Sequence, residues 1–556
     1  MPQSIGGADC DRLGGYDTVI VGAGLAGIAA GKELTHLGRS VLILEAAGRV
    51  GGRGFVGQVR AGGPGDSPVP IDYGGAWIHG VASNPLTSLV DQMGFKRSRS
   101  ELDVPYFVDG ERATREQHDL FREAYEEYER ALSAAAARLE YEWFVADQAC
   151  GESKAVEAGR LPAAELCDHI ERALSNAETA SRLCEQARLV ERRALPSSRF
   201  CEQSETAIRV TSDIAADYLP QEGKFRDVIP LLSASAGPLE TSRELDASSA
   251  ADAAGFEAGE DDLVDKGLGT FVRQFGEGLP VCLNSPVTRI EYGGRGVKVH
   301  SGARIYEAAA ALLTVSVGVL QSGKIEFEPA LPAWKREAID NLRMGHMQKV
   351  IIPFEKDIFG EELANTWVLY EGKVEPAEKA LAASANLGIQ ARDRRVMAFV
   401  LKPLGANIGI GFYGGEWAQL FESQCEGRER TSGLRSPSGC DDMAIDAAVR
   451  ALAAMYGDSA VNGAIQSDQI HVTRWSLEPF TLGAYSVPKP GEWDKREVLR
   501  RPVAAVGGEN NPPRLFFAGE ACSPSIYNGS YPGALETGIR AAREIHTEIL
   551  AARSAK

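Results

Sequence analysis

The first eighty residues of the chain alternate between apolar runs and glycine-rich turns. Two apolar runs, "DTVIV" from Asp17 and "SVLIL" from Ser40, flank a segment with helical spacing, "IAAGKELTHLG". A strand, a glycine turn, a helix and a second strand in this order form a βαβ unit. The pattern therefore predicts a parallel sheet that begins near residue 17.

The middle of the chain changes character twice. From about Glu111 to Ala194 it is rich in Ala, Glu, Arg and Leu, and its large apolar residues recur near every 3.6 positions. These residues are Phe121, Tyr125, Tyr128, Leu132, Leu139 and Trp143. We expect a helical insertion here. Residues 233–262 are small and acidic, which predicts a long surface loop or lid.

Strand patterns return in "PVCLNSPVTRIEY", "GVKVHSG" and "AAALLTVSVGVL", and a mixed α/β region follows from about residue 326 to 470. The chain closes with a strand, "PRLFFAGE", a glycine turn and a helix. The first and last units therefore look like parts of one nucleotide-binding sheet. We predict an α/β fold with two domains. A doubly wound, Rossmann-like domain would comprise 1–82, 263–325 and 471–556, and an α+β substrate-binding domain with the helical insertion would comprise 83–262 and 326–470.

One of the later strand patterns, "GHMQKVIIPF", contains a single charge. Alternation places Lys349 on the same face as Met347 and Ile351, while the other face is entirely apolar. Two interpretations are open from this stretch. In the first, the lysine reaches solvent or pairs with a carboxylate; in the second, it serves a buried site.

Composition excludes several classes of protein. The 556 residues, 44% hydrophobic and 24% charged, are typical of a globular protein of two or three domains. A net charge of -18 opposes binding to nucleic acids or to anionic membranes. The apolar segment from Thr18 to Ala30 is too short to span a bilayer. We expect a cytoplasmic protein, with a homodimer compatible with the sequence.

Nine cysteines are spread without a CxxC pair. An odd number without paired spacing indicates neither a complete disulfide framework nor a zinc site, so we expect no metal and a reducing compartment. Cys150, Cys167, Cys184 and Cys201 recur at a constant spacing that matches no whole number of helical turns.

The glycine turn after the first strand carries the first candidate site. Gly22, Gly24 and Gly27 permit a tight turn and close approach of a pyrophosphate, with Leu25 and Ala26 opening the helix behind it. At the end of the next strand, Glu45 can accept a hydrogen bond from a ribose hydroxyl. The combination predicts dinucleotide binding. A purely structural turn is the alternative.

The run "EAAGRVGGR" decides which dinucleotide is expected. Glu45, Arg49, Gly51, Gly52 and Arg53 together resemble the second fingerprint of the FAD-dependent amine oxidase family, whose members include monoamine and polyamine oxidases. "DYGGAWIHG" resembles the loop that this family lays along the flavin, "PVTRIEY" its adenine-contacting strand, and "FFAGE" its closing motif. An NAD enzyme would leave the arginine-glycine turn and "FFAGE" unexplained.

The resemblance implies further contacts with FAD. They are assigned to Gly74, Gly75, Ala76, Trp77, Val287, Gly519, Glu520, Ser530 and Tyr531. Some relatives have a cysteine joined covalently to FAD where this chain has Ala484. We therefore expect FAD to be held non-covalently.

The resemblance also implies four catalytic residues. Lys349 matches a lysine that holds a water at the flavin N5, and Trp475 and Tyr485 would supply aromatic walls around the amine. The position that is tyrosine in monoamine oxidases aligns with Ser530, which predicts a more open cage. His79 would accept from a secondary amine or help deprotonate it, unless it is only a turn residue. Core packing is the alternative for the two aromatic residues.

The resemblance implies oxidation of a small-molecule amine, such as a polyamine or other long amine. A hydride equivalent would pass to FAD, the imine would hydrolyse, and O2 would be reduced to hydrogen peroxide. Two alternatives stay open. An L-amino-acid oxidase or flavin monooxygenase would need a cationic clamp, which "GGAWIHG" lacks. A flavoprotein that acts on or binds a protein partner would expose apolar surface on the helical insertion.

Overall fold

The computed structural model describes the chain as residues 3–5, 9–63, 65–100, 105–174, 177–201, 213–255, 259–294, 296–428, 439–504, 512–523 and 525–554. Within these ranges no helix combines the length and the apolar character needed to cross a bilayer.

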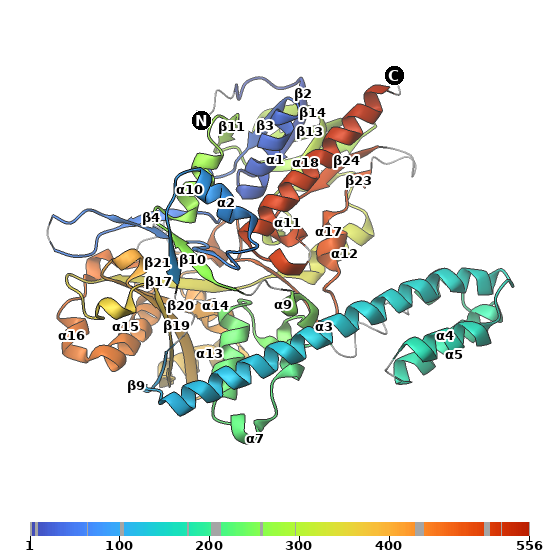
Figure 1. Cartoon of the computed structure of the whole chain (residues 1–556). Coiled ribbons are helices and arrows are strands. Elements are labelled where there is room, and N and C mark those ends of the chain that lie inside the picture. The colour runs from blue at the N-terminus through green and yellow to red at the C-terminus, as the bar shows by residue number, and fades with distance from the viewer. Residues whose placement is uncertain are drawn as a thin grey trace.

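The larger sheet has ten strands and lies at the top of the view in Figure 1. Its central strands β3, β2, β14 and β24 run parallel, as the βαβ pattern predicts. The strand order is β1-β11-β3-β2-β14-β13-β12-β15, with β24 and β23 joined beside β14. The bounds are β1 Gln3–Ile5, β2 Tyr16–Val21, β3 Val41–Leu44, β11 Val281–Leu283, β12 Val287–Gly293, β13 Gly296–Ser301, β14 Arg304–Leu313, β15 Glu326–Glu328, β23 Val503–Ala504 and β24 Pro513–Phe517.

Two helices from opposite ends of the chain cover one face of this sheet. Helix α1 (Leu25–His36) and helix α18 (Tyr531–Ser554) lie side by side in Figure 1 and share one apolar core with the sheet. Gly538 of α18 allows the two helices to approach closely, because a Cβ there would lie 2.3 Å from the Ala26 carbonyl oxygen of α1. The prediction that the first and last units build one sheet is confirmed. The domain boundaries themselves stay a prediction.

The second large sheet has seven strands in the order β21-β17-β20-β19-β18-β8-β9. On β17, Met347 and Ile351 enter one apolar core, whereas Val350, Ile352 and Phe354 enter another. The predicted alternation around Lys349 is therefore confirmed. The bounds are β8 Tyr106–Val108, β9 Glu111–Arg112, β17 Met347–Pro353, β18 Thr366–Lys373, β19 Arg394–Leu401, β20 Ile408–Gly414 and β21 His471–Val472.

Smaller elements join the two large sheets. Three short sheets contain β4 Val56–Val59 with β5 Val69–Asp72, β6 Trp77–Ile78 with β10 Asp261–Val264 and β7 Arg97–Ser100, and β16 Leu342–Met344 with β22 Ser486–Pro488. The remaining helices outside the insertion are α2 Pro85–Gln92, α7 Glu222–Phe225, α8 Ile229–Ala234, α9 Ala250–Ala254, α10 Leu268–Phe275, α11 Val317–Gln321, α12 Ala333–Asn341, α13 Pro376–Ser384, α14 Gly415–Ser423, α15 Asp442–Tyr456, α16 Asp458–Asn462 and α17 Lys495–Arg500.

The predicted helical insertion is confirmed and forms an arm. Helix α3 (Arg115–Glu157) crosses the molecule and extends beyond it, where α4 (Ala163–Ala173) and α5 (Ala177–Glu191) lie against its far end (Figure 1). Thr114 and Gln117 form a capping box that fixes the start of α3. The tip of the arm has an apolar core of its own. This core is separate from the cores of the two large sheets, which together form the body of the molecule.

The prediction of a long surface loop or lid for residues 233–262 is wrong. The described part of this segment contains a short π-helix, Ser235–Leu239, the helix α9 and the first half of strand β10. Ala236, Leu245 and Ala250 are buried in a core. Small residues here allow close packing against neighbouring backbone: a Cβ at Gly237 would lie 3.1 Å from the Arg243 carbonyl oxygen.

The disulfide framework is incomplete, as predicted, because Cys167, Cys184 and Cys522 are free thiols. The cysteine spacing did not, however, indicate that the other six cysteines are paired. Disulfides join Cys10 to Cys282, Cys150 to Cys201, and Cys425 to Cys440. The pairs are 272, 51 and 15 residues apart in sequence, and such distances carry no spacing signal. Cys425, Cys440 and Asp441 are close enough together to suit a metal ion, but the two sulfur atoms are bonded to each other and Asp441 pairs with Arg474.

Candidate functional site

The predicted dinucleotide turn lies where β2 ends and α1 begins. Gly24 is the N-cap of α1 and provides no side-chain cap, so first-turn amide groups of the helix stay available to an anion. A Cβ built on Gly24 meets nothing within 4 Å. Leu25 and Ala26 follow as buried residues of the first helical turn. An uncapped helix N-terminus beside open space suits a pyrophosphate.

Glu45 and Val287, the residues predicted to contact the ribose and the adenine, lie beside this turn. The buried Glu45 carboxylate accepts hydrogen bonds from the backbone amides of Ala23 (2.7 Å) and Ala47 (2.8 Å). Burial raises the pKa of Glu45, although these amides act in the opposite direction. The Ser285 amide donates to the Glu45 carbonyl at 2.8 Å, and Val287 begins strand β12 two residues later. Glu45 and Val287 therefore lie near each other.

Arg53 connects the arginine-glycine run near the start of the chain with the "FFAGE" motif near its end. Arg53 donates to the Glu520 carboxylate at 2.8 Å and to the Ala484 carbonyl at 2.9 Å. The nearby Arg53 and Arg496 charges hold the pKa of the buried Glu520 below its usual range. Gly519 precedes Glu520 with a φ of 126°, which favours glycine. Arg49 donates to the Gly52 carbonyl at 2.7 Å and stays within its own turn.

Lys349 is buried, and its ammonium group donates to two backbone carbonyls of the glycine loop. The acceptors are Asp72, at 2.9 Å, and Gly74. The ammonium also lies 5.7 Å from the ring centroid of Trp77 and 5.2 Å from that of Phe412. Desolvation lowers the pKa of Lys349 to about 8, although the nearby Asp72 charge opposes the shift. Solvent exposure and direct pairing with a carboxylate are both excluded by these contacts.

Asp72 and Phe412 belong to the Lys349 surroundings but were not predicted from the sequence. The Asp72 carboxylate accepts from the amides of Leu268 (2.9 Å) and Gly269 (3.0 Å) at the start of α10. Burial raises the pKa of Asp72 to about 6. Phe412 is paired with Lys349 across the β17 and β20 strands. The available signals were an aspartate inside a strand pattern and the alternation of "IGIGFYG", neither of which identifies a partner.

The predicted aromatic residues surround the same loop. The Trp475 indole N–H donates to the Tyr73 carbonyl at 3.1 Å, and Trp475 is buried. Tyr531 donates to the Gly75 carbonyl at 3.1 Å. A Cβ on Gly75 would lie 2.6 Å from the Tyr531 ring, so this tyrosine packs on the loop. Ala76 and Trp77 continue the loop, whereas Ser530 donates to Tyr527 and contacts none of these residues through its hydroxyl.

Tyr485 and Tyr125 both donate hydrogen bonds to Glu240, a residue that was not predicted from the sequence. The Tyr485 hydroxyl donates to the Glu240 carbonyl, and the Tyr125 hydroxyl donates to the Glu240 carboxylate. The Nδ1 atom of His79 lies 2.9 Å from the Asp261 carboxylate. The Glu240 side chain is exposed, yet surrounding protein raises its pKa to about 7 through desolvation.

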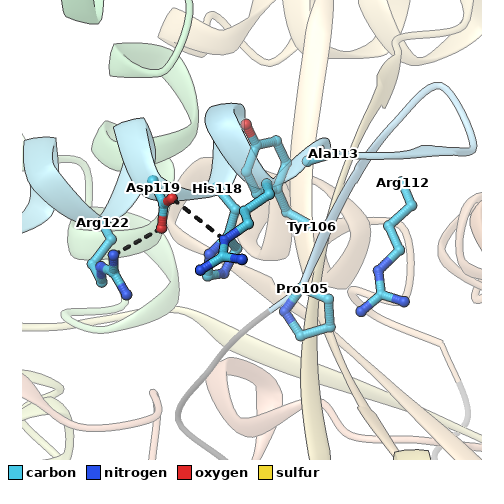
Figure 2. Close-up of a pocket in the computed structure, with 8 residues that line it drawn as sticks. Pro105, Tyr106, Arg112, Ala113, His118, Asp119 and Arg122 are labelled. Carbon is cyan, nitrogen blue, oxygen red and sulfur yellow. Dashed lines mark hydrogen bonds and ion pairs between the residues drawn. The ribbon is translucent and has the colours of Figure 1, made fainter.

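A separate pocket of about 440 Å³ lies at the start of α3, away from Lys349 (Figure 2). Among the described residues of its wall, Arg112, Arg115, His118 and Arg122 are basic and Asp119 is the one carboxylate. Arg115 and Arg122 both lie within ion-pair distance of Asp119. Positive side chains of this kind do not favour a cationic amine.

Comparison with known proteins decides the family. The model of the flavin-containing amine oxidoreductase family matches residues 25–546. The chain belongs to this family. Its cofactor is therefore FAD, and the uncapped α1 terminus, the open space at Gly24 and the buried Glu45 fit that group. No side-chain nucleophile is present at Ala484 for a covalent bond.

Relatives at the sequence level fall into two groups. The chain is 26% identical over 534 residues to lysine-specific histone demethylase 1 homolog 1 of Arabidopsis thaliana, covering 95% of this chain and 52% of that protein. It is 27% identical over 539 residues to polyamine oxidase 4 of Oryza sativa subsp. japonica, covering 96% and 89%. The chain thus spans about half the length of the demethylase relatives and most of the length of the polyamine oxidase.

Solved structures show the same fold at lower identity. A putrescine oxidase bound to putrescine superposes with a TM-score of 0.62 at 18% identity, covering 96% of this chain and 99% of the other. Cyclohexylamine oxidase from Brevibacterium oxydans gives a TM-score of 0.58 at 19% identity, with the same coverage. The predicted α/β architecture of a FAD-binding and a substrate-binding part is confirmed. The catalytic roles of Lys349, Tyr485, Trp475 and His79 stay predictions.

Proposed function

We propose that this protein oxidises a small-molecule amine that carries a second positive charge, such as a diamine or polyamine. When bound, FAD would accept the hydride equivalent that leaves the C–H bond next to the amine nitrogen, while the nitrogen lone pair forms the C=N bond of the imine. The resulting imine hydrolyses to an aldehyde or ketone, and O2 takes the electrons and is released as hydrogen peroxide. The chain's own residues hold the neutral reacting nitrogen in a largely desolvated place.

Glu240 is the observation that supports a second charge on the substrate. Its side chain is exposed, and its backbone carbonyl accepts a hydrogen bond from the predicted cage residue Tyr485. Burial raises the pKa of Glu240, and repulsion from Glu129 and Asp261 adds to this effect, whereas Tyr125 and His79 act in the opposite direction. A second ammonium group on the substrate would relieve this repulsion and form a charge-assisted hydrogen bond. A substrate carboxylate would meet the opposite effect, which disfavours an L-amino-acid oxidase.

Trp475 and Tyr485 are assigned to positioning. Trp475 is fixed by its hydrogen bond to Tyr73, and Tyr485 by its bond to the Glu240 carbonyl, so neither ring needs to reorganise when an amine arrives. The Nδ1 atom of His79 lies 2.9 Å from the Asp261 carboxylate, which fixes the orientation of the ring. These roles rest on geometry and on the family resemblance.

The arm favours a second candidate function. Tyr141 and Phe144 are one helical turn apart on α3 and are 53% and 52% exposed. Exposed aromatic residues of this kind suit a protein partner, and several relatives are named as histone demethylases. The alternative is oxidation of an amine on a lysine side chain of a protein. It predicts that free amines are poor substrates and that a lysine-containing peptide is a good one.

The Glu240→Gln variant tests the proposal. Glutamine keeps an acceptor for Tyr125 but removes the charge. We expect the preference for 1,4-diaminobutane over butylamine, measured as a ratio of kcat/KM values, to fall about tenfold, as loss of one charge-assisted hydrogen bond implies. In the unaltered protein, the same preference should fall as the pH drops through about 7, where Glu240 takes up a proton.

Glu123→Gln is the matched control, because it removes the same charge from the exposed surface of α3, where Glu123 pairs with Lys224. It should leave the diamine preference unchanged. A Glu240→Gln protein that keeps the full preference would contradict the assignment of Glu240. A FAD-loaded protein that oxidises neither amine would contradict the proposed function.

A further inference from the structure

Four charged side chains of alternating sign link the "FFAGE" motif to helix α9. The Glu520 carboxylate accepts from Arg53 at 2.8 Å through one oxygen, and its other oxygen lies 3.9 Å from Arg496. Arg496 in turn donates to both carboxylate oxygens of Asp252, at 2.6 and 3.0 Å. The side chains of Arg496, Glu520 and Asp252 are 2%, 6% and 10% exposed, so solvent screens these charges little.

Arg496 is bound by as many acceptors as it has donors. A guanidinium group carries five N–H bonds in a fixed planar arrangement. Two reach the Asp252 carboxylate, two reach the hydroxyl and the carbonyl of Ser486 at 2.7 Å each, and one reaches the Glu520 carbonyl at 3.4 Å. These acceptors belong to α9, to β22 and to the "FFAGE" motif. One side chain therefore fixes three segments that are separate in the sequence.

The same residues hold the backbone on both sides of Tyr485. The Glu520 carboxylate accepts from the Ser486 hydroxyl at 2.5 Å and from the Ser486 amide at 3.3 Å. Arg53 donates to the Ala484 carbonyl at 2.9 Å. Tyr485 lies between these two anchored residues. Its position, and the orientation of the Glu520 side chain that the family resemblance assigns to FAD, therefore depend on one arrangement of charges.

Stability alone does not account for this arrangement. Burial of charged groups is costly, and well-packed apolar side chains in their place are often as stable or more stable. A hydrogen-bonded ion pair also supplies direction, because its bonds are satisfied in one orientation. Asp252 takes two of the Arg496 donors and thereby leaves the others to Ser486 and Glu520.

We propose that Arg496, anchored by Asp252, is a positioning residue that couples cofactor binding to the order of α9 and of the backbone at Tyr485. Contact of Glu520 with the cofactor restricts the carboxylate, and Arg496 passes this restriction to α9. Because coupling of binding free energies is reciprocal, release of Asp252 from Arg496 weakens FAD binding in turn. The inference concerns FAD and does not depend on which amine the protein oxidises.

Amide hydrogen exchange of the unaltered protein, with and without FAD, is the first test. We expect FAD to slow exchange in α9 and in β22 by roughly fivefold or more. Helix α13 is the internal control, because it packs on the other large sheet through the Glu378–Arg395 ion pair, and its exchange should stay the same. Equal exchange of α9 with and without FAD would overturn the inference.

Two variants release the anchor in different ways. Asp252→Asn keeps the side-chain volume and one acceptor but removes the charge, and Arg496→Lys keeps the charge but loses the planar fork. We expect both to raise the Kd of the apoprotein for FAD by roughly fivefold to tenfold and to abolish the effect of FAD on exchange in α9. Arg395→Lys is the matched control, because Arg395 forms a comparably buried ion pair with Glu378. It should lower the melting temperature without changing the Kd for FAD.

A purely structural ion pair would give a different result. Asp252→Asn would then lower the melting temperature of the apoprotein, as Arg395→Lys does, and leave the Kd for FAD unchanged. An unchanged Kd in Asp252→Asn would overturn the inference, whatever the melting temperature. Should Arg496→Lys not fold, Asp252→Asn and the exchange of the unaltered protein decide. Neither measurement uses an amine, so absence of amine oxidation would contradict the proposed function and leave the coupling in place.

Discussion

At the scale of single residues, Lys349 shows how a buried charge is made tolerable. Transfer of an ammonium group out of water is costly unless it is compensated. Here two carbonyls of the glycine loop accept from it, and the faces of Trp77 and Phe412 lie within 6 Å of it. The compensation is partial, which is why the pKa falls to about 8. The residue is therefore close to a change of charge at ordinary pH.

The first prediction concerns the pH dependence of the oxygen reaction. If the ammonium form of Lys349 assists O2, kcat/KM for O2 should be constant below pH 8. Above about pH 8 it should fall by about tenfold per pH unit as Lys349 loses its proton. The measurement is reoxidation of the amine-reduced enzyme at several pH values and oxygen concentrations.

Lys349→Met removes the titrating group while preserving most of the side-chain volume. We expect this variant to bind FAD, to react more slowly with O2, and to lack the decline above pH 8. Lys335→Met is a control, since Lys335 is another buried lysine but caps carbonyls of Val498 and Leu499. A Lys349→Met enzyme with the same alkaline decline would contradict the assignment.

At the scale of elements, two glycines between β2 and α1 have different roles. Gly27 is needed for folding, and Gly24 is needed for cofactor binding. A Cβ on Gly27 would lie 2.0 Å from the Gly22 carbonyl, so the helix could not keep its position on the strand. A Cβ on Gly24 would meet no protein atom within 4 Å. The space beside Gly24 is where the pyrophosphate is expected.

The second prediction compares two alanine substitutions. Gly24→Ala should fold with an unchanged melting temperature in the absence of FAD but lose most of its flavin. Gly27→Ala should lower the melting temperature as well, because the clash lies within the protein itself. The measurements are flavin absorbance per protein and thermal unfolding of the apoprotein. Gly63→Ala, in open space at a loop, is the control. Full flavin content in Gly24→Ala would contradict the predicted pyrophosphate position.

At the scale of the whole molecule, the arm is a separate unit of stability. The core at its tip includes residues of α3, α4 and α5 and contains none of the body's strands. The Cys150–Cys201 disulfide closes a loop that encloses α4 and α5. Chain entropy alone assigns roughly 4 kcal/mol to a closure of this length.

The third prediction is that Cys150→Ser loosens the arm and leaves the body unchanged. Amide hydrogen exchange of α4 and α5 should accelerate, whereas exchange in β17 and flavin content should not change. Cys425→Ser removes a disulfide from the body and should leave α4 and α5 protected. Equal acceleration in the arm and in β17 of Cys150→Ser would show that the two parts unfold together.

The sequence by itself determined the local features. Hydrophobic periodicity located the βαβ unit, the β17 strand and the helical insertion, because alternation and 3.6-residue spacing are properties of neighbouring residues. The glycine turn and Glu45 predicted dinucleotide binding, because the backbone geometry of a phosphate-binding turn needs glycine at fixed positions. The family and FAD were indicated by the resemblance of the arginine-glycine run and of "FFAGE" to known motifs.

Only the tertiary structure decided which distant groups meet. The partners of Lys349 are carbonyls of Asp72 and Gly74, and a backbone carbonyl has no signature in a sequence. Glu240 gained its importance from contacts with Tyr125 and Tyr485, more than a hundred residues away in either direction. The disulfides and the ordered segment at 233–262 depend in the same way on long-range packing. Side-chain periodicity reports which face is buried, whereas the identity of the group across that face is fixed only when the chain has folded.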